Sequence, residues 1–178
     1  MSPNPLDEVW EDYIATRDCF RIAQEVVSAG EVRFLKRTAF VSDTSRQSEE
    51  TIIKNRNRAD EFFILALWVV FERYIISLFQ KKGEVLKDIT PHLFADGFYN
   101  KVEFEIERWR IEDLLDILKN LIDPNFVGDA KNIKRYRDWI AHKNPKKPAP
   151  SKTDPQFAYS VLSGIIKTIE FVDEIERT

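Results

Sequence analysis

Cysteine, histidine and glycine are all scarce in this chain of 178 residues. Cys19 is the only cysteine, so an internal disulfide and a zinc site built from several thiolates are both excluded. The two histidines, His92 and His142, are far apart and show no zinc-binding spacing. The sequence contains no glycine-rich phosphate loop and no recognisable Ser-His-Asp set. We therefore expect a protein of the reduced cytoplasm without a cofactor or a bound metal.

Long apolar runs are missing as well. The most apolar stretch, residues 62–71, ends at Glu72 and Arg73 and is shorter than the roughly 20 residues that a membrane-spanning helix needs. The chain begins with acidic rather than basic residues, unlike a signal peptide. These features predict a cytoplasmic protein with no membrane partner, in which residues 62–71 form a buried helix.

Apolar side chains recur every three or four residues through most of the chain, which predicts an all-α, single-domain helical bundle. Gly30 suits the end of the first helix, Ser45 or Ser48 the start of the second, and Gly83 its end. Residues 31–40 are ambiguous, and residues 84–97 resemble a turn region with His92 on its surface. We divide the chain into a helical extension packed on the core, residues 1–46, and a bundle, residues 47–178. The expected helices cover about residues 5–29, 49–82, 98–122, 127–142 and 155–176.

Two groups of charged residues have more than one interpretation each. Glu72 and Arg73 interrupt the apolar part of the second helix, and they mark a change of the buried face, form an internal ion pair, or line a site. Carboxylates are frequent between residues 103 and 116, where they either coat a solvated face or supply metal or acid–base groups. Their spacing spreads them around a helix, which favours the solvated face.

Positive charge is concentrated near the end of the chain although the net charge is −3. Residues 128–152 contain eight lysines and arginines against two aspartates, a local charge of +6, so the remainder carries −9. This asymmetry is compatible with a phosphate-binding patch on an acidic protein, and equally with a solvated polar face.

The residues that most suggest chemistry lie in the stretch 135–145. At about 100° per residue, Ile133, Tyr136, Trp139 and Ile140 share one side of a helix and Asp138 and His142 lie on the other. Arg137 and His142 are about 140° apart on one helix, so a second copy of the motif would be needed to complete a site around them. Pro145 predicts that the helix ends near His142 or Lys143, and the proline-rich segment 143–154 is expected to be an exposed basic loop.

The sequence Arg137-Asp138-x-x-x-His142 resembles the Rx4-6H signature of the HEPN superfamily, a group of all-helical domains that includes many metal-independent ribonucleases. The resemblance covers about residues 47–178. It implies a HEPN-like bundle and a symmetric homodimer in which two copies of the motif face each other. It also implies a toxin or defence ribonuclease that cleaves RNA through the 2′-hydroxyl, leaves 2′,3′-cyclic phosphate ends, and is silenced by an antitoxin or another protein partner.

Within that interpretation each polar residue of the motif region has an expected role. His142 moves a proton, Arg137 clamps the scissile phosphate, and Asp138 orients His142 or caps the helix. The residues expected to bind RNA are Arg135, Lys143, Asn144 and Lys147.

Two further interpretations stay open. The first is a non-catalytic HEPN-type module that binds a nucleotide, RNA or a protein partner, with Arg137, Asp138 and His142 forming only an ion pair and a helix cap. The second is a helical dimer whose basic patch docks an acidic partner or polyphosphate.

Overall fold

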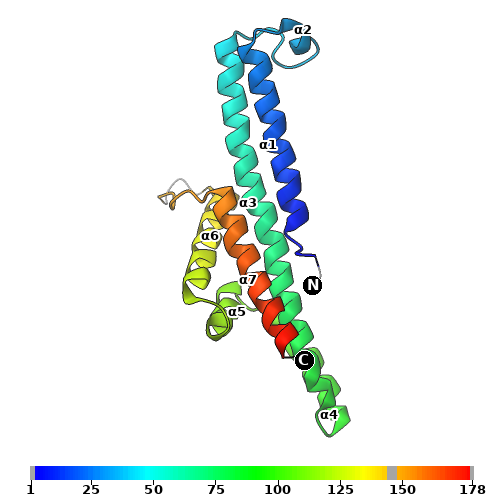
Figure 1. Cartoon of the computed structure of the whole chain (residues 1–178). Helices are drawn as coiled ribbons and strands as arrows, with labels where there is room; N and C mark the ends of the chain where they lie inside the picture. Colours follow the sequence, from blue (N-terminus) through cyan, green and yellow to red (C-terminus); the bar gives the residue numbers. More distant parts are fainter. Residues whose placement is uncertain (1–2, 144–147, 177–178) are drawn as a thin grey trace.

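The structure, a computed structural model, describes residues 3–143 and 148–176, and all regular secondary structure in these residues is helical, which confirms the all-α prediction. Figure 1 shows one very long helix with the other helices placed along it. The helices are α1 (Asp7–Ser28), α2 (Val32–Leu35), α3 (Ser45–Gly83), α4 (His92–Ile106), α5 (Ile111–Ile117), α6 (Pro124–His142) and α7 (Pro155–Ile175), with short 3-10 turns at η1 (Glu84–Asp88) and η2 (Leu118–Asn120).

Helix α3 organises the molecule. Its 39 residues correspond to a length of about 58 Å at the usual rise per residue. The helix begins at a capping box that the sequence interpretation missed: the Thr44 hydroxyl accepts from the Gln47 N–H at 3.3 Å, and the Gln47 side chain accepts from the Thr44 N–H at 2.9 Å. The prediction that Ser45 or Ser48 is the cap is therefore wrong, because Thr44 has the extended backbone that a cap needs while Ser48 is buried inside the helix.

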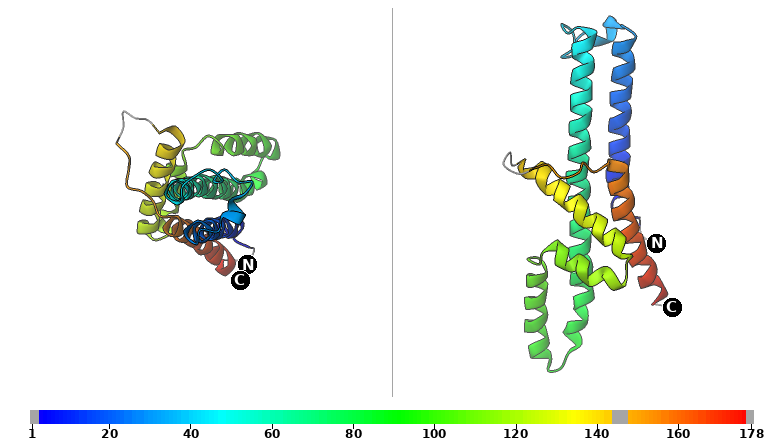
Figure 2. Two further views of the ribbon diagram at one scale, coloured as in Figure 1. Left: turned by 90° about the horizontal axis from the view of Figure 1, so that it is seen from above. Right: turned by 90° about the vertical axis from the view of Figure 1, so that its left-hand side faces the viewer.

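Helices α1 and α3 run antiparallel and form a hairpin that extends well beyond the rest of the fold (Figures 1 and 2). Helix α1 ends at Ser28, just before Gly30 as expected, since Gly30 has a φ of +67° and the N–H groups of Gly30 and Glu31 bond to the Val27 and Val26 carbonyls. At the other end of α1, Leu6 and Tyr13 are buried in the main hydrophobic core. The residues assigned to an N-terminal extension thus share one continuous core with the bundle.

Helices α6, α7 and α5 pack around the C-terminal half of α3. The α3 side chains at the centre, Leu67, Trp68 and Phe71, have no exposed surface. They share the core with a set of fully or nearly fully buried aliphatic side chains from the other helices: Leu114, Leu115, Ile133, Leu162, Ile165 and Ile166. Helix α7 begins at Pro155 and ends at Ile175, in agreement with the expected range.

The region between α3 and α6 differs from the prediction. A turn at 84–97 followed by one helix over 98–122 was expected, whereas the structure has η1, then α4 from His92, a break at 107–110, and then α5. At the break, the Arg73 guanidinium bonds to the Glu107 carboxylate at 2.8 and 3.2 Å, and Ile106 and Ile111 on either side are buried. The break thus arises from contacts with α3, which a local helical pattern does not reveal. His92 is exposed, as expected.

Helix α3 is buried on one face only. Phe63 and Leu67 are in the core, as expected of residues 62–71, but Phe62 and Val69 are 65% and 56% exposed. The continuous helical segment Ser45–Asp88 is long enough to cross a bilayer, and its most apolar window has a mean hydropathy of 2.0, with 33% of that window buried. Core helices of soluble proteins reach the same values, so this is weak evidence for a membrane span.

Candidate functional site

Helix α6 holds the Arg-Asp-His motif in the expected orientation. It starts at Pro124, three residues earlier than predicted, because Asp123 caps it by accepting a hydrogen bond from the Asn125 N–H at 2.8 Å. The core face is as predicted: Ile133, Tyr136 and Ile140 are buried and Trp139 packs against the core. The helix ends at His142, since Lys143 has a left-handed backbone and donates its N–H to the Trp139 carbonyl at 2.6 Å.

Arg137 is held between two carboxylates. Its Nη1 lies 3.0 Å from the Asp138 Oδ1 and its Nη2 lies 3.6 Å from the Glu72 Oε2 of α3. The Arg137 side chain is about three-quarters buried, and its Nε is inaccessible and has no hydrogen-bond partner in the described structure. Of the two charges that interrupt the apolar helix, Glu72 therefore lies at the motif, whereas Arg73 lies at Glu107.

The Asp138 carboxylate contacts two cations, Lys134 and Arg137, and not His142, the residue that it was expected to orient. Its second oxygen accepts from Lys134 Nζ at 2.7 Å, and Lys134 also contacts Glu112 of α5 at 3.0 Å. Burial raises the pKa of Asp138, but the hydrogen bonds from Lys134 and Arg137 outweigh burial and leave this pKa below its ordinary value. No contact joins Asp138 to His142 in the described structure, so the geometry gives Asp138 the role of positioning Arg137.

His142 stands at the exposed end of α6 and has no hydrogen bond or ion pair with any described residue. The next residue, Lys143, contacts Glu61 of α3 at 2.7 Å. Beyond the loop, Lys152 lies 4.0 Å from Asp60. The loop that follows the motif is thus tied at both ends to consecutive residues of α3. Asn144 and Lys147, which were also expected to bind RNA, lie outside the described residues.

Most of the described cations in segment 128–152 contact carboxylates. Lys131 pairs with Asp116 of α5 at 2.7 Å, and Lys134, Arg137 and Lys143 each contact a carboxylate of another helix. Arg135 differs, because its guanidinium donates to Asn132 and has no carboxylate partner in the described chain. Among the described residues of segment 128–152, every cation other than Arg135 therefore lies next to a carboxylate.

An open hollow of about 550 Å³ lies beside Arg135. It is bordered by the outer face of α6 and by the segment that leads into α7, which contributes Lys152 and Phe157. Nothing in the sequence indicates that these two segments enclose a common space. In the acidic region, Glu112 and Asp116 contact lysines of α6, and no group of three or more metal-ligating side chains occurs among the described residues.

Sequence reasoning also missed a polar cluster between α1 and α3. The Asp60 carboxylate is almost fully buried and accepts from the Tyr13 hydroxyl at 2.9 Å and from the Arg17 guanidinium at 3.0 Å. Burial, and then the Asp60 carboxylate, raise the pKa of Tyr13 to about 12. Asp60 is more than 40 positions from both Tyr13 and Arg17, so these contacts have no local signal in the sequence.

Comparison of this chain with models of known families, with curated proteins and with solved structures gives no match. The resemblance to HEPN domains therefore depends on the motif and on its place at the end of the penultimate helix.

Proposed function

We propose that this chain is a metal-independent endoribonuclease with a defence or toxin role, and that Arg137 and His142 are its catalytic residues. The observation that supports the proposal most directly is the exposed position of His142 at the end of α6, without a partner in the described structure and little more than one turn beyond Arg137. Imidazole is the side chain best suited to exchange protons near neutral pH.

In the proposed reaction the 2′-hydroxyl of the RNA attacks the adjacent phosphorus and loses its proton to a base. The bond from phosphorus to the 5′-oxygen breaks, and this oxygen receives a proton from an acid. The products are a 2′,3′-cyclic phosphate and a free 5′-hydroxyl. His142 carries one proton, and Arg137 neutralises charge on the nonbridging phosphate oxygens.

One copy of the motif leaves the second proton transfer without a group. The two side chains diverge by about 140° on an ideal helix, so we propose that a second copy of the chain supplies the facing histidine. The exposed apolar side chains of α3, including Val69 at 56% exposure, offer surface for such an association.

Arg137 has to change partners to act. In the resting geometry it contacts Glu72 and Asp138, and a phosphate would replace the more distant Glu72 at 3.6 Å. Both side chains of this pair keep about a quarter to a third of their surface exposed, and ion pairs of this kind are worth at most about 1 kcal/mol. Such an exchange has a low cost.

The same ion pairs favour the second candidate, a non-catalytic module for RNA, nucleotides or a protein. If the Arg137–Glu72 ion pair only stabilises the packing of α6 on α3, the motif has a structural role and His142 is an ordinary surface residue. The two candidates differ in turnover: the enzyme loses cleavage but keeps its fold when His142 is replaced, whereas the module never cleaves.

The test is cleavage of a mixed-sequence RNA and of transfer RNA in EDTA, with product ends identified by mass spectrometry. We expect cyclic phosphate ends that disappear in His142→Ala and Arg137→Ala but persist in His92→Ala, the matched control, which removes the other histidine from an exposed position on α4. Intact RNA at high protein concentration, or equal losses in both histidine variants, would exclude the catalytic role.

A further inference from the structure

Two ion pairs define the face of α3 that points toward the motif. Glu72 contacts Arg137 and Glu61 contacts Lys143, and both acidic residues belong to α3. They are 11 residues apart, which is about three helical turns, so their side chains leave α3 in nearly the same direction. Arg137 and Lys143 thus bracket the end of α6 along one face of α3.

The same face continues past the end of α6 into the hairpin. Lys54 precedes Glu72 by 18 residues, about five full turns, and so points in the same direction. Lys54, Arg58 and Phe62 follow one another at intervals of four and form a single ridge along the helix. Along the helix axis the ridge begins about 10 Å beyond Glu61 and ends level with it, where Phe62 points about 100° away from Glu61.

The ridge is open to solvent. Lys54 and Arg58 are exposed and have no ion pair within the described chain, in contrast to Lys134 and Arg137 on α6. Phe62 is 65% exposed. Figures 1 and 2 show α1 running alongside the part of α3 that extends beyond α6 and α7.

Cations without partners beside an exposed aromatic ring are the elements that bind single-stranded nucleic acid: the cations hold phosphates and the ring stacks on a base. Lys54 and Arg58 are about 6 Å apart along the helix, and both lie on one line, as suits one strand. Lys54 points in nearly the same direction as Glu61, which contacts Lys143, the residue after His142.

We propose that Lys54, Arg58 and Phe62 bind the single-stranded RNA segment next to the bond that is cut. This inference rests on the proposed function, which gives RNA as the substrate. It assigns RNA binding to the α1–α3 hairpin. Lys54 and Arg58 contact two successive phosphates, and Phe62 stacks on a base close to His142.

The first test measures binding of a labelled single-stranded uridine oligonucleotide as a function of salt, with His142→Ala as the background in every protein. We expect Lys54→Ala with Arg58→Ala to weaken binding about tenfold and to lower the slope of log affinity against log salt by about 1.4, the value for two lost phosphate contacts on a single strand.

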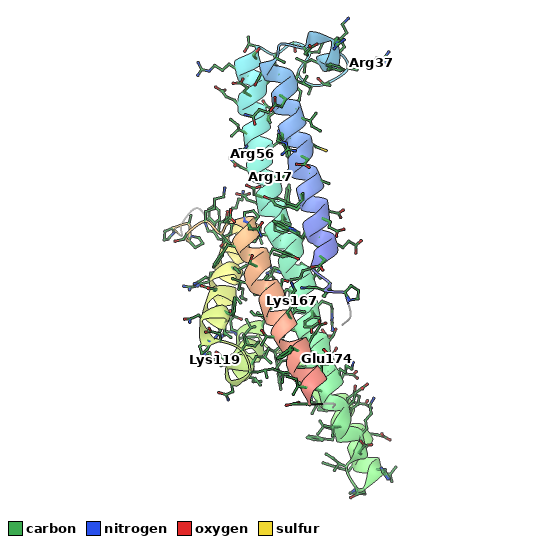
Figure 3. The ribbon with its side chains drawn as sticks, in the orientation of Figure 1. Arg17, Arg37, Arg56, Lys119, Lys167 and Glu174 are labelled. Atoms are coloured by element: carbon green, nitrogen blue, oxygen red, sulfur yellow. The ribbon has the colours of Figure 1, made fainter. Side chains whose placement is uncertain are left out.

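The matched control removes two charges elsewhere, in Lys81→Ala with Lys167→Ala. Both lysines are exposed and without an ion pair in the described chain, and Lys167 lies on α7, far from the hairpin tip marked by Arg37 (Figure 3). The control is expected to keep the slope of the background protein. Equal changes in both double variants would overturn the proposal, because the effect would then reflect net charge alone.

The second test concerns the ring. We expect Phe62→Ala to weaken oligonucleotide binding about tenfold, to leave the salt slope unchanged, and to leave binding of inorganic polyphosphate unchanged, because polyphosphate has no bases to stack. Phe171→Ala, which removes a comparably exposed ring from α7, is the matched control and should bind normally. If Phe62→Ala changes the mass of the protein in light scattering and leaves RNA affinity intact, Phe62 belongs to a contact between copies and the proposal is wrong.

These experiments test the catalytic proposal and the RNA-binding proposal independently. If the oligonucleotide binds with the expected dependence on Lys54, Arg58 and Phe62 but no RNA is cut in EDTA, the ridge is supported and the catalytic role of His142 is refuted. If RNA is cut while the ridge variants bind like the background protein, the ridge is refuted and the enzyme stands. Absence of oligonucleotide binding by the background protein also overturns the ridge.

Discussion

Replacing Asp138 by asparagine tests which neighbour its carboxylate holds in place. The sequence suggested His142, four residues further along the helix, whereas the structure directs the two carboxylate oxygens at Arg137 and Lys134. Double-mutant cycles for the free energy of unfolding separate these partners, because a cycle isolates the interaction of one pair. The matching replacements are Arg137→Gln, Lys134→Gln and His142→Gln.

The expected coupling energies follow from distance and exposure. The Asp138 oxygens lie 3.0 Å from Arg137 and 2.7 Å from Lys134, with side chains 37%, 26% and 19% exposed. Ion pairs near the surface contribute about 0.2–1 kcal/mol, and the limited exposure here places both at the upper end. We therefore expect about 1 kcal/mol for each of Arg137 and Lys134, which both lie on α6 with Asp138, and a value below the error of roughly 0.3 kcal/mol for His142.

Urea unfolding followed by circular dichroism at pH 7 measures all three cycles. Since its partners lower the pKa of Asp138, their stabilisation is full above its ordinary value of 3.8 and is lost as pH falls through the lower pKa of the folded state. Both couplings should therefore fade in strong acid. A coupling to His142 as large as that to Arg137 would refute the geometry and restore Asp138 as the orienting partner of the histidine.

Four other outcomes follow from the contacts. Thr44→Ala should destabilise the protein by about 1 kcal/mol and Ser45→Ala by much less, a difference visible in urea midpoints; equal losses would contradict the capping box. Asp60→Asn should cost about 2 kcal/mol in the same assay, because it removes the charge from a buried hydrogen-bonded cluster, and a loss below about 0.5 kcal/mol would argue against that cluster. Because the pKa of Tyr13 is raised from 10.0 to about 12, the stability that its proton provides should be complete below pH 10 and decrease as pH rises toward 12; constant thermal midpoints across this range would contradict it. Glu72→Gln should raise kcat/KM for RNA cleavage about two- to fivefold by freeing Arg137, and a decrease would show that Glu72 positions the arginine instead.

The predictable part of the fold is the part that depends on local pattern. The period of apolar residues located α1, α3, α6 and α7 within a few residues, and Gly30 marked the end of α1 through its left-handed backbone. The core face of α6 was likewise predictable, because it depends on helical spacing alone. The Thr44 cap carried a visible signal, a threonine followed three positions later by Gln47, which was overlooked.

The remaining features depend on contacts between distant residues. The break after α4 forms where Arg73 meets Glu107, 34 positions away, and α4 itself begins in a stretch rich in turn-forming residues. The Asp60 cluster joins two helices across more than 40 positions. Local helix propensity does not include such contacts, so neither the break after α4 nor the Asp60 cluster could be predicted from a sequence pattern.

The distribution of surface charge also depends on contacts between distant residues, and this affects where RNA could bind. Counting along the sequence placed the cationic surface on residues 128–152, but α3 and α5 supply carboxylates to Lys131, Lys134, Arg137 and Lys143. A phosphate gains less from a cation that must first leave a carboxylate than from one that only leaves water. These four cations are therefore poorer anchors for RNA than a cation without a carboxylate partner, such as Arg135. Lys54 and Arg58 have no such partner either, so we expect them to contribute more to RNA binding than the paired cations around the motif.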